Sequence, residues 1–132
     1  MEITVIQKEG RVPVTFFQVE GQINMGSTEE LEDRARQEHA AGMHYLLIDL
    51  SQVTSLTSAG LRTIHLINNL LSSNPPADAA PDEEQEFGGA KSTSPYLKLL
   101  NPQSDTRRVL NISGFDSFIE VFDDLQVALD SF

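Results

Sequence analysis

The stretch from Tyr45 to Leu71 constrains the fold of this 132-residue chain more than any other. It begins with Tyr45–Leu50, which is apolar enough for a strand in the middle of a sheet. A cluster of hydroxyl and small residues follows at Thr54–Leu61. Apolar side chains then recur at helical spacing at Leu61, Ile64, Ile67 and Leu71. The sequence therefore predicts a buried strand that is followed closely by an amphipathic helix.

Strands and helices are expected to alternate along most of the chain. The strands are expected at Glu2–Gln7, Val12–Val19, His44–Leu50, Tyr96–Leu100 and Phe118–Phe122. The helices are expected at residues 27–41, 58–72, 104–112 and 123–131, with caps at Ser27, at Ser104 or Asp105, and at Asp123 or Asp124. This order predicts an α/β fold, with a mixed, mainly parallel sheet of four to five strands and about four helices packed against it.

The chain is acidic and contains no cysteine. Its formal net charge of −11 disfavours binding to nucleic acid or to an anionic membrane surface, because both depend on Lys and Arg. The absence of cysteine excludes disulfide bonds, thiolate catalysis and cysteine-based zinc sites. Neither a membrane-spanning apolar run nor a signal peptide is visible, so we expect a cytoplasmic protein without a membrane span. The length predicts a single domain, residues 1–132.

Residues 73–95 interrupt the alternation with a stretch rich in proline, glycine and acidic residues. They show neither a helical nor a strand period. Loops of this length are functional or disordered, and this composition favours disorder. We therefore expect an acidic, disordered insertion, which is either a tolerated solvated excursion or an arm that binds a partner.

Ser58 lies where the buried strand gives way to the helix, close to the expected helix N-terminus. The first N–H groups of a helix have no partner within it, and the helix dipole favours negative charge there. Two interpretations follow. Ser58 is a structural cap, since serine is preferred at such positions, or it is a phosphate acceptor whose added charge would meet a favourable local field.

Three blocks of the sequence resemble the STAS family, the domains of sulfate transporters and anti-sigma factor antagonists. The first block comprises Gly21–Asn24, Ser27, Thr28 and Leu31. The second comprises Leu47–Ser51 and Leu56–Arg62, and the third comprises Arg108–Leu110, Ser113–Phe115 and Phe118–Phe122. The blocks occur in the family's order at similar spacing, and they span most of the chain. The resemblance implies the same fold as the alternation of elements.

The resemblance to the antagonist branch implies a regulatory protein-binding domain and not an enzyme. A partner anti-sigma factor or switch-protein serine kinase would phosphorylate the residue that corresponds to Ser58. The added charge would release the complex, which is how partner switching regulates transcription. The implied partner-binding surface comprises Gly21, Asn24, Ser27, Asp49, Thr57, Ser58, Ala59, Gly60 and Arg62.

Two residues depart from the family pattern, because Thr57 and Asn24 stand where Asp is usual. Thr57 supplies a second hydroxyl and is therefore an alternative acceptor. The missing carboxylate favours an alternative function, an assembly module that binds a scaffold or a transporter component without phosphorylation. Asn24 keeps the size of Asp and one acceptor oxygen but not the charge.

Other groups in the sequence point to weaker candidate sites. Asp49 is expected near the end of its strand, where ligands of open α/β sheets bind. Nucleotide or small-ligand sensing is therefore a third alternative, unless Asp49 only accepts N–H groups of the following loop. The histidines are not spaced as metal ligands, and the chain has neither a Gly-rich phosphate loop nor a hydrolase nucleophile motif. We expect no metal or cofactor, and a monomer or weak homodimer.

Overall fold

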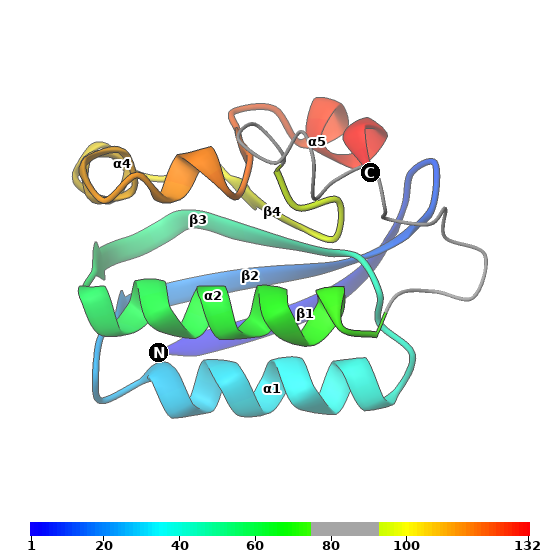
Figure 1. Cartoon of the computed structure of the whole chain (residues 1–132), viewed down its shortest axis with the longest axis horizontal. Coiled ribbons are helices and arrows are strands. Elements are labelled where there is room, and N and C mark those ends of the chain that lie inside the picture. Colours follow the sequence, from blue (N-terminus) through cyan, green and yellow to red (C-terminus); the bar gives the residue numbers. More distant parts are fainter. Residues whose placement is uncertain (75–92) are drawn as a thin grey trace.

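The computed structural model describes residues 1–74 and 93–132, which form one sheet with helices on both of its faces (Figure 1). In chain order the elements are β1 (Glu2–Glu9), β2 (Pro13–Ile23), α1 (Thr28–Ala40), β3 (Leu46–Leu56), α2 (Ser58–Ser72), β4 (Leu97–Leu100), α4 (Ser104–Ile112), the 3-10 helix η2 (Phe115–Ser117), β5 (Val121–Phe122) and α5 (Leu125–Ser131). Every strand and helix expected from the sequence has a counterpart here. The predicted α/β class is confirmed.

The strands follow one another in the sheet in sequence order, β1-β2-β3-β4-β5. β1 pairs with β2 antiparallel, and each of the other neighbouring pairs is parallel. Parallel neighbours need crossover connections, which contain α1, α2 and α4 here. The sheet is therefore mixed and mainly parallel, as the alternation of elements predicts.

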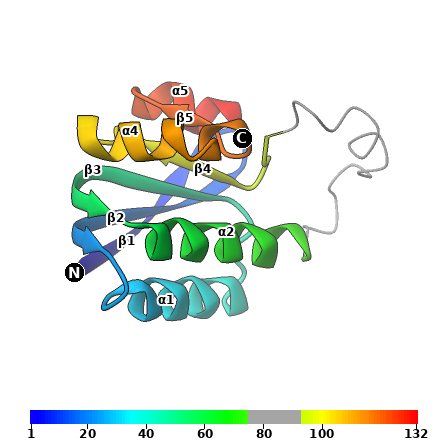
Figure 2. The same cartoon turned by 60° about the vertical axis from the view of Figure 1, so that its left-hand side comes forward.

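The helices cover the two faces of the sheet unequally. The core on one face takes its helical side chains from α1, α2 and α4, namely Leu31, Ala35, Ile64, Ile67, Leu71 and Leu110. Among the described residues, α5 is the only helix on the other face, where Ala128 and Leu129 pack on Val14, Phe16 and Leu47. Figure 2 shows α1, α2 and α4 in front of the sheet and α5 behind its upper part. The sheet thus separates a large core from a small one.

The strand bounds differ from those predicted, most of all in β2, β3 and β5. β2 runs on to Ile23 instead of ending at Val19. β3 continues past Leu50 to Leu56, because it keeps pairing with β2 through two register shifts. Its added residues alternate irregularly between buried and exposed, since each shift changes which side chains face the core. β5 contains only Val121 and Phe122 instead of the predicted five residues.

The predicted cap residues are right for α1 and α5 and wrong for α4. Asp124 caps α5, since its carboxylate accepts the Val127 N–H at 3.1 Å. Gln103 occupies the N-cap position of α4 and makes no side-chain cap bond. Neither Ser104 nor Asp105 is therefore the cap of α4. Ser27 is the N-cap residue of α1, as predicted, but its hydroxyl bonds within the preceding turn and makes no cap bond to the helix.

The flanks of the predicted insertion belong to the folded part of the chain. Ser73 ends α2, and the Asn74 carbonyl accepts a hydrogen bond from Nδ1 of His44 at 3.2 Å. Ser94 is buried, and its hydroxyl accepts the N–H groups of Tyr96 and Leu97. The predicted disorder concerns residues 75–92, which lie outside the described residues.

Candidate functional site

The first and second blocks of the sequence meet where β2 and β3 end. Ile23 and Leu56 are paired as the last residues of these parallel strands. The Thr57 N–H donates to the Ile23 carbonyl at 3.1 Å, and the Thr54 hydroxyl donates to the Gly21 carbonyl at 3.3 Å. The turn after β2 and the start of α2 therefore form one continuous surface at the C-terminal edge of the sheet, on the left of Figure 1.

Gly60 allows the start of α2 to approach the strand ends closely. A Cβ atom at this position would lie 2.7 Å from Cγ2 of Ile23 and 2.7 Å from Cδ1 of Leu56. It would also lie 2.8 Å from the Ile23 carbonyl oxygen, which is backbone and cannot rotate away. Any side chain here would push the helix away from the sheet, so glycine fixes where the neighbouring Ser58 and Ala59 are presented.

The turn at residues 21–27 is held by its own polar side chains. The Ser27 hydroxyl donates to the Gln22 carbonyl at 2.6 Å and accepts the Asn24 N–H at 3.1 Å. The Asn24 side chain accepts the Gly26 N–H at 2.9 Å and donates to Oε1 of Gln22 at 3.0 Å. An aspartate could make the first of these Asn24 contacts but not the second, because a carboxylate has no proton to donate. Asn24 and Ser27 therefore shape the turn, whatever else they contact.

Thr57, and not Ser58, is the cap of α2. The Thr57 hydroxyl accepts the Gly60 N–H at 3.4 Å and donates to the Ile23 carbonyl at 3.3 Å. Ser58 is the first residue of the helix, and it is exposed. The interpretation of Ser58 as a structural cap is therefore wrong, and the two adjacent hydroxyls have different surroundings.

A shallow cleft of about 640 Å³ lies between the starts of α1 and α2. Ser58, Ala59 and Arg62 line it from α2, and Thr28 and Glu32 line it from α1. Two exposed apolar side chains border it, Met25 at 82% exposure and Leu66 at 39%. The described lining of the cleft thus combines several hydroxyls, one cation, one carboxylate and an apolar rim, which is the mixed chemistry of a protein-binding surface.

The sequence interpretation missed five residues that line the cleft, namely Met25, Thr28, Glu32, Thr63 and Leu66. Leu66 stands four residues after Arg62 and eight after Ser58, so the helical period alone could have placed it on the same face. Met25 had no such signal. Its exposure follows from the turn, which carries it to the outside of the molecule beside α2.

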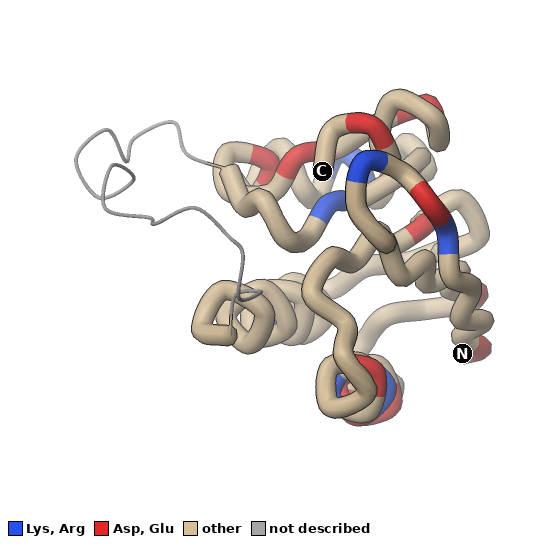
Figure 3. Tube along the Cα trace, turned by 90° about the vertical axis from the view of Figure 1, so that its right-hand side faces the viewer, with Lys and Arg blue, Asp and Glu red and all other residues tan. Residues whose placement is uncertain are grey.

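The two walls of the cleft differ in charge. α1 carries acidic and basic residues along its whole length, including ion pairs from Arg36 to Glu32 at 2.6 Å and from Arg34 to Glu38 at 3.7 Å. Arg62 is the only charged residue of α2. In Figure 3, α1 is accordingly red and blue, whereas α2 beside it is tan over most of its length. A partner would therefore meet an almost neutral helix next to an acidic one.

Asp49 does not belong to this surface. Because β3 continues to Leu56, Asp49 lies within the strand and not near its end. It is 7% exposed, and its carboxylate accepts the Ser51 N–H at 2.9 Å. Side chains alternate along a strand, so Asp49 shares the face of Leu47, which α5 partly covers. The expected position of Asp49 at the strand end is wrong, and its bond is local.

No helix in residues 1–74 or 93–132 is long and apolar enough to cross a membrane. Within the same residues, no three His, Asp or Glu side chains are grouped as ligands for a metal ion. The cleft therefore offers hydrogen bonds, a single cation and apolar contact as its means of recognition.

A family model described as "STAS domain" matches residues 5–73, more than half of the chain. The chain belongs to the STAS domain family. The match includes the turn at residues 21–27 and the junction at residues 54–61, and it ends before the third block of the sequence resemblance. The predicted family is therefore confirmed. No curated protein matches this STAS domain in sequence.

Solved structures of anti-sigma factor antagonists share the fold of this STAS domain. One from Mycobacterium paratuberculosis has 22% identity and a TM-score of 0.67, with 97% of this chain and 92% of that chain covered. A putative antagonist from Thermotoga maritima has 20% identity and a TM-score of 0.66, with 87% and 83% covered. SpoIIAA of Bacillus in its unphosphorylated form has 11% identity and a TM-score of 0.65, with 95% and 92% covered. At these identities the likeness concerns the fold.

Proposed function

We propose that this STAS domain is an anti-sigma factor antagonist whose binding to a partner is controlled by phosphorylation of Ser58. The partner is an anti-sigma factor or a switch-protein serine kinase. It docks on the turn at residues 21–27, on the junction at residues 54–62 and on the cleft between α1 and α2. The domain acts by binding in this proposal, Ser58 is a substrate and not a catalyst, and the protein works in the cytoplasm.

The difference between the two hydroxyls of the junction carries this proposal. A kinase needs an acceptor oxygen that can leave the protein surface and enter its active site. The Thr57 hydroxyl holds two backbone groups, on Ile23 and Gly60, and moving it would undo the start of α2. Ser58 is exposed at the edge of the cleft and makes no contact on which the fold depends. Ser58 is therefore the better acceptor, although Thr57 stands where the family usually has Asp.

The surroundings of Ser58 explain how a phosphate there would act. The phosphate brings about −1.5 to −2 charges to the N-terminus of α2, where free N–H groups and the helix dipole stabilise it. Arg62 stands one turn along the same helix and lines the same cleft, so it can pair with the phosphate. The phosphate would thus neutralise the one cation of the cleft and repel any carboxylate that a partner had placed there. We expect release of the partner without unfolding of the domain.

Incubation with the cognate anti-sigma factor kinase and ATP, followed by mass spectrometry, tests the acceptor. We expect one phosphate on Ser58, its loss in Ser58→Ala and its retention in Ser104→Ala. Ser104 is a matched control, because it is also exposed and also the first residue of a helix, α4. A phosphate on Thr57, or phosphorylation of Ser104 to the same extent, would contradict the assignment.

The alternative is an assembly module that binds a scaffold or a transporter component without phosphorylation. The replacement of the family's usual Asp by Thr57 favours it, and the segment at residues 75–92 would then carry the specific contact. Pull-downs that compare Ser58→Asp with deletion of residues 76–92 separate the two functions. If the domain is a phosphorylation-controlled antagonist, Ser58→Asp abolishes binding; if it is an assembly module, the deletion abolishes binding. The deletion must spare Ser94, whose hydroxyl holds the backbone before β4.

A further inference from the structure

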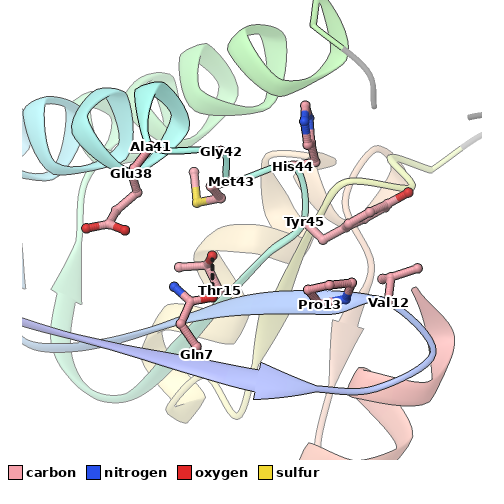
Figure 4. A pocket seen from close by; sticks show the side chains of 10 residues that line it. All are labelled: Gln7, Val12, Pro13, Thr15, Glu38, Ala41, Gly42, Met43, His44 and Tyr45. Atoms are coloured by element: carbon pink, nitrogen blue, oxygen red, sulfur yellow. Dashed lines mark hydrogen bonds between the residues drawn. The ribbon is translucent and has the colours of Figure 1, made fainter. Parts of the chain in front are cut away.

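A second pocket lies at the opposite end of the molecule from the cleft. β2 runs from Pro13 at this pocket to Ile23 at the candidate site, and α1 runs from the site back to the pocket. The pocket is formed by the ends of β1, β2 and α1 and by the residues that lead into β3 (Figure 4). Its volume of about 340 Å³ falls within the range of small-molecule sites, about 300–1,000 Å³.

One end of the pocket is polar and rich in hydrogen-bond acceptors. Figure 4 shows Glu38, Gln7 and Thr15 gathered at this end. Thr15 is only 4% exposed, and its hydroxyl donates to Oε1 of Gln7 across a long 3.5 Å. Glu38 is the only Asp, Glu, Lys or Arg among the described residues that line the pocket, and it forms an ion pair with Nε of Arg34 at 3.7 Å. A pair of this length on a helix surface is weak, so the carboxylate keeps free lone pairs.

The other end of the pocket is apolar. Val12, Pro13 and the ring of Tyr45 line it, and the Met43 side chain lies between the two ends (Figure 4). The Tyr45 ring is braced by Tyr96 at 5.9 Å and by Phe132 at 6.0 Å between ring centroids. This wall is therefore preformed, and a ligand would not have to order it on binding. The pocket thus has a carboxylate at one end and apolar side chains at the other.

We propose that this pocket binds a small organic cation, an amine that carries an apolar ring. The ammonium group would lie at Glu38 and donate to Oε1 of Gln7, since charge-assisted pairs of this kind are among the strongest hydrogen bonds. The ring would lie against Tyr45 and Pro13. The net charge of −11 favours cations over anions at any such site. This site is separate from the partner-binding cleft and does not depend on the function proposed for it.

Phenethylamine and 3-phenylpropionate are suitable probes, because they have similar size and opposite charge. In a ¹H–¹⁵N NMR titration of the full chain, we expect phenethylamine to cause saturable shifts at Gln7, Thr15 and residues 42–45. We expect 3-phenylpropionate to cause none there. Equal binding of both probes, saturable shifts at other residues only, or no saturable shift up to the solubility limit of the amine would each overturn the proposal.

Glu38→Gln removes the charge from the pocket and keeps its shape, and we expect it to weaken phenethylamine binding at least tenfold. Asp33→Asn is the matched control, because Asp33 is an exposed acid on the same helix outside the pocket. Asp33→Asn changes the net charge by the same amount as Glu38→Gln, and we expect it to change the affinity for phenethylamine less than twofold. If both variants weaken binding equally, the attraction comes from the general charge of the protein and the site at Glu38 is wrong.

Discussion

Because the Thr57 hydroxyl caps α2 and the Ser58 hydroxyl does not, we expect these two neighbouring hydroxyls to differ in their contribution to stability. Thr57→Ala removes the cap of α2 and its bond to the Ile23 carbonyl. Loss of a helix cap costs about 1 kcal/mol, and both bonds are long, so we expect a destabilisation of about 1 kcal/mol and not the upper limit of about 2. Ser58→Ala removes an exposed hydroxyl, and we expect a change within about 0.5 kcal/mol.

Thermal unfolding by circular dichroism measures this difference directly. With an unfolding entropy of about 2.1 cal/mol/K per residue, a chain of 132 residues loses about 4 °C of Tm for each kcal/mol of stability. Thr57→Ala should therefore lower Tm by about 4 °C, Thr57→Ser should recover most of this loss because it restores the oxygen, and Ser58→Ala should change little. An equal loss in Thr57→Ala and Ser58→Ala would refute the reasoning, because Ser58 would then also hold the helix start.

Three further variants test other parts of the molecule. Thr106→Val should raise Tm slightly, because the Thr106 hydroxyl is buried with no hydrogen-bond partner among the described residues; a lower Tm would mean that it has one. Glu120→Gln should cost more stability than Lys98→Met in urea unfolding. The Lys98 side chain is 4% exposed and its partner Glu120, 2.7 Å away, is 43% exposed, so Glu120→Gln leaves a buried unpaired charge, whereas Lys98→Met leaves a carboxylate that water reaches. The reverse order of stabilities would contradict this. Met25→Ala should weaken partner binding by more than about 1 kcal/mol at unchanged Tm, whereas Ile112→Ala, which is as exposed but remote from the cleft, should not; equal effects on binding would remove Met25 from the interface.

The order of strands and helices could be predicted from the sequence because each element has a clear apolar period. The helical stripe from Ile64 to Leu71 packs in the large core together with Leu46, Ile48 and Leu50 of the apolar run. Leu47 of the same run packs in the small core. The far half of β3 could not be predicted in this way. Its polar residues resemble a loop, and they form a strand because β2 supplies a partner. Strand pairing of this kind is a tertiary effect that local propensity does not contain.

The candidate site was predictable as a region but not in its details. The hydroxyl cluster at residues 54–61 indicates the helix start, yet Thr57 and Ser58 are both good caps by residue type. The choice depends on Ile23, which is distant in sequence and close in space. Met25 likewise reaches the cleft through the geometry of the turn. Contacts between the first and second blocks of the sequence therefore decide which hydroxyl is the cap and which is free to accept a phosphate, and neither block alone contains this information.

We propose that a phosphate on Ser58 releases the partner, and a comparison of the partner's affinity for the phosphorylated and unphosphorylated domain tests this most directly. Isothermal titration calorimetry can compare the domain phosphorylated on Ser58 with the unphosphorylated domain, against the same anti-sigma factor without ATP. Regulatory coupling of about 1–3 kcal/mol corresponds to a change in affinity of about 5- to 150-fold. We predict that phosphorylation raises Kd by a factor in this range. The same Kd for both forms would mean that a phosphate on Ser58 does not control partner binding.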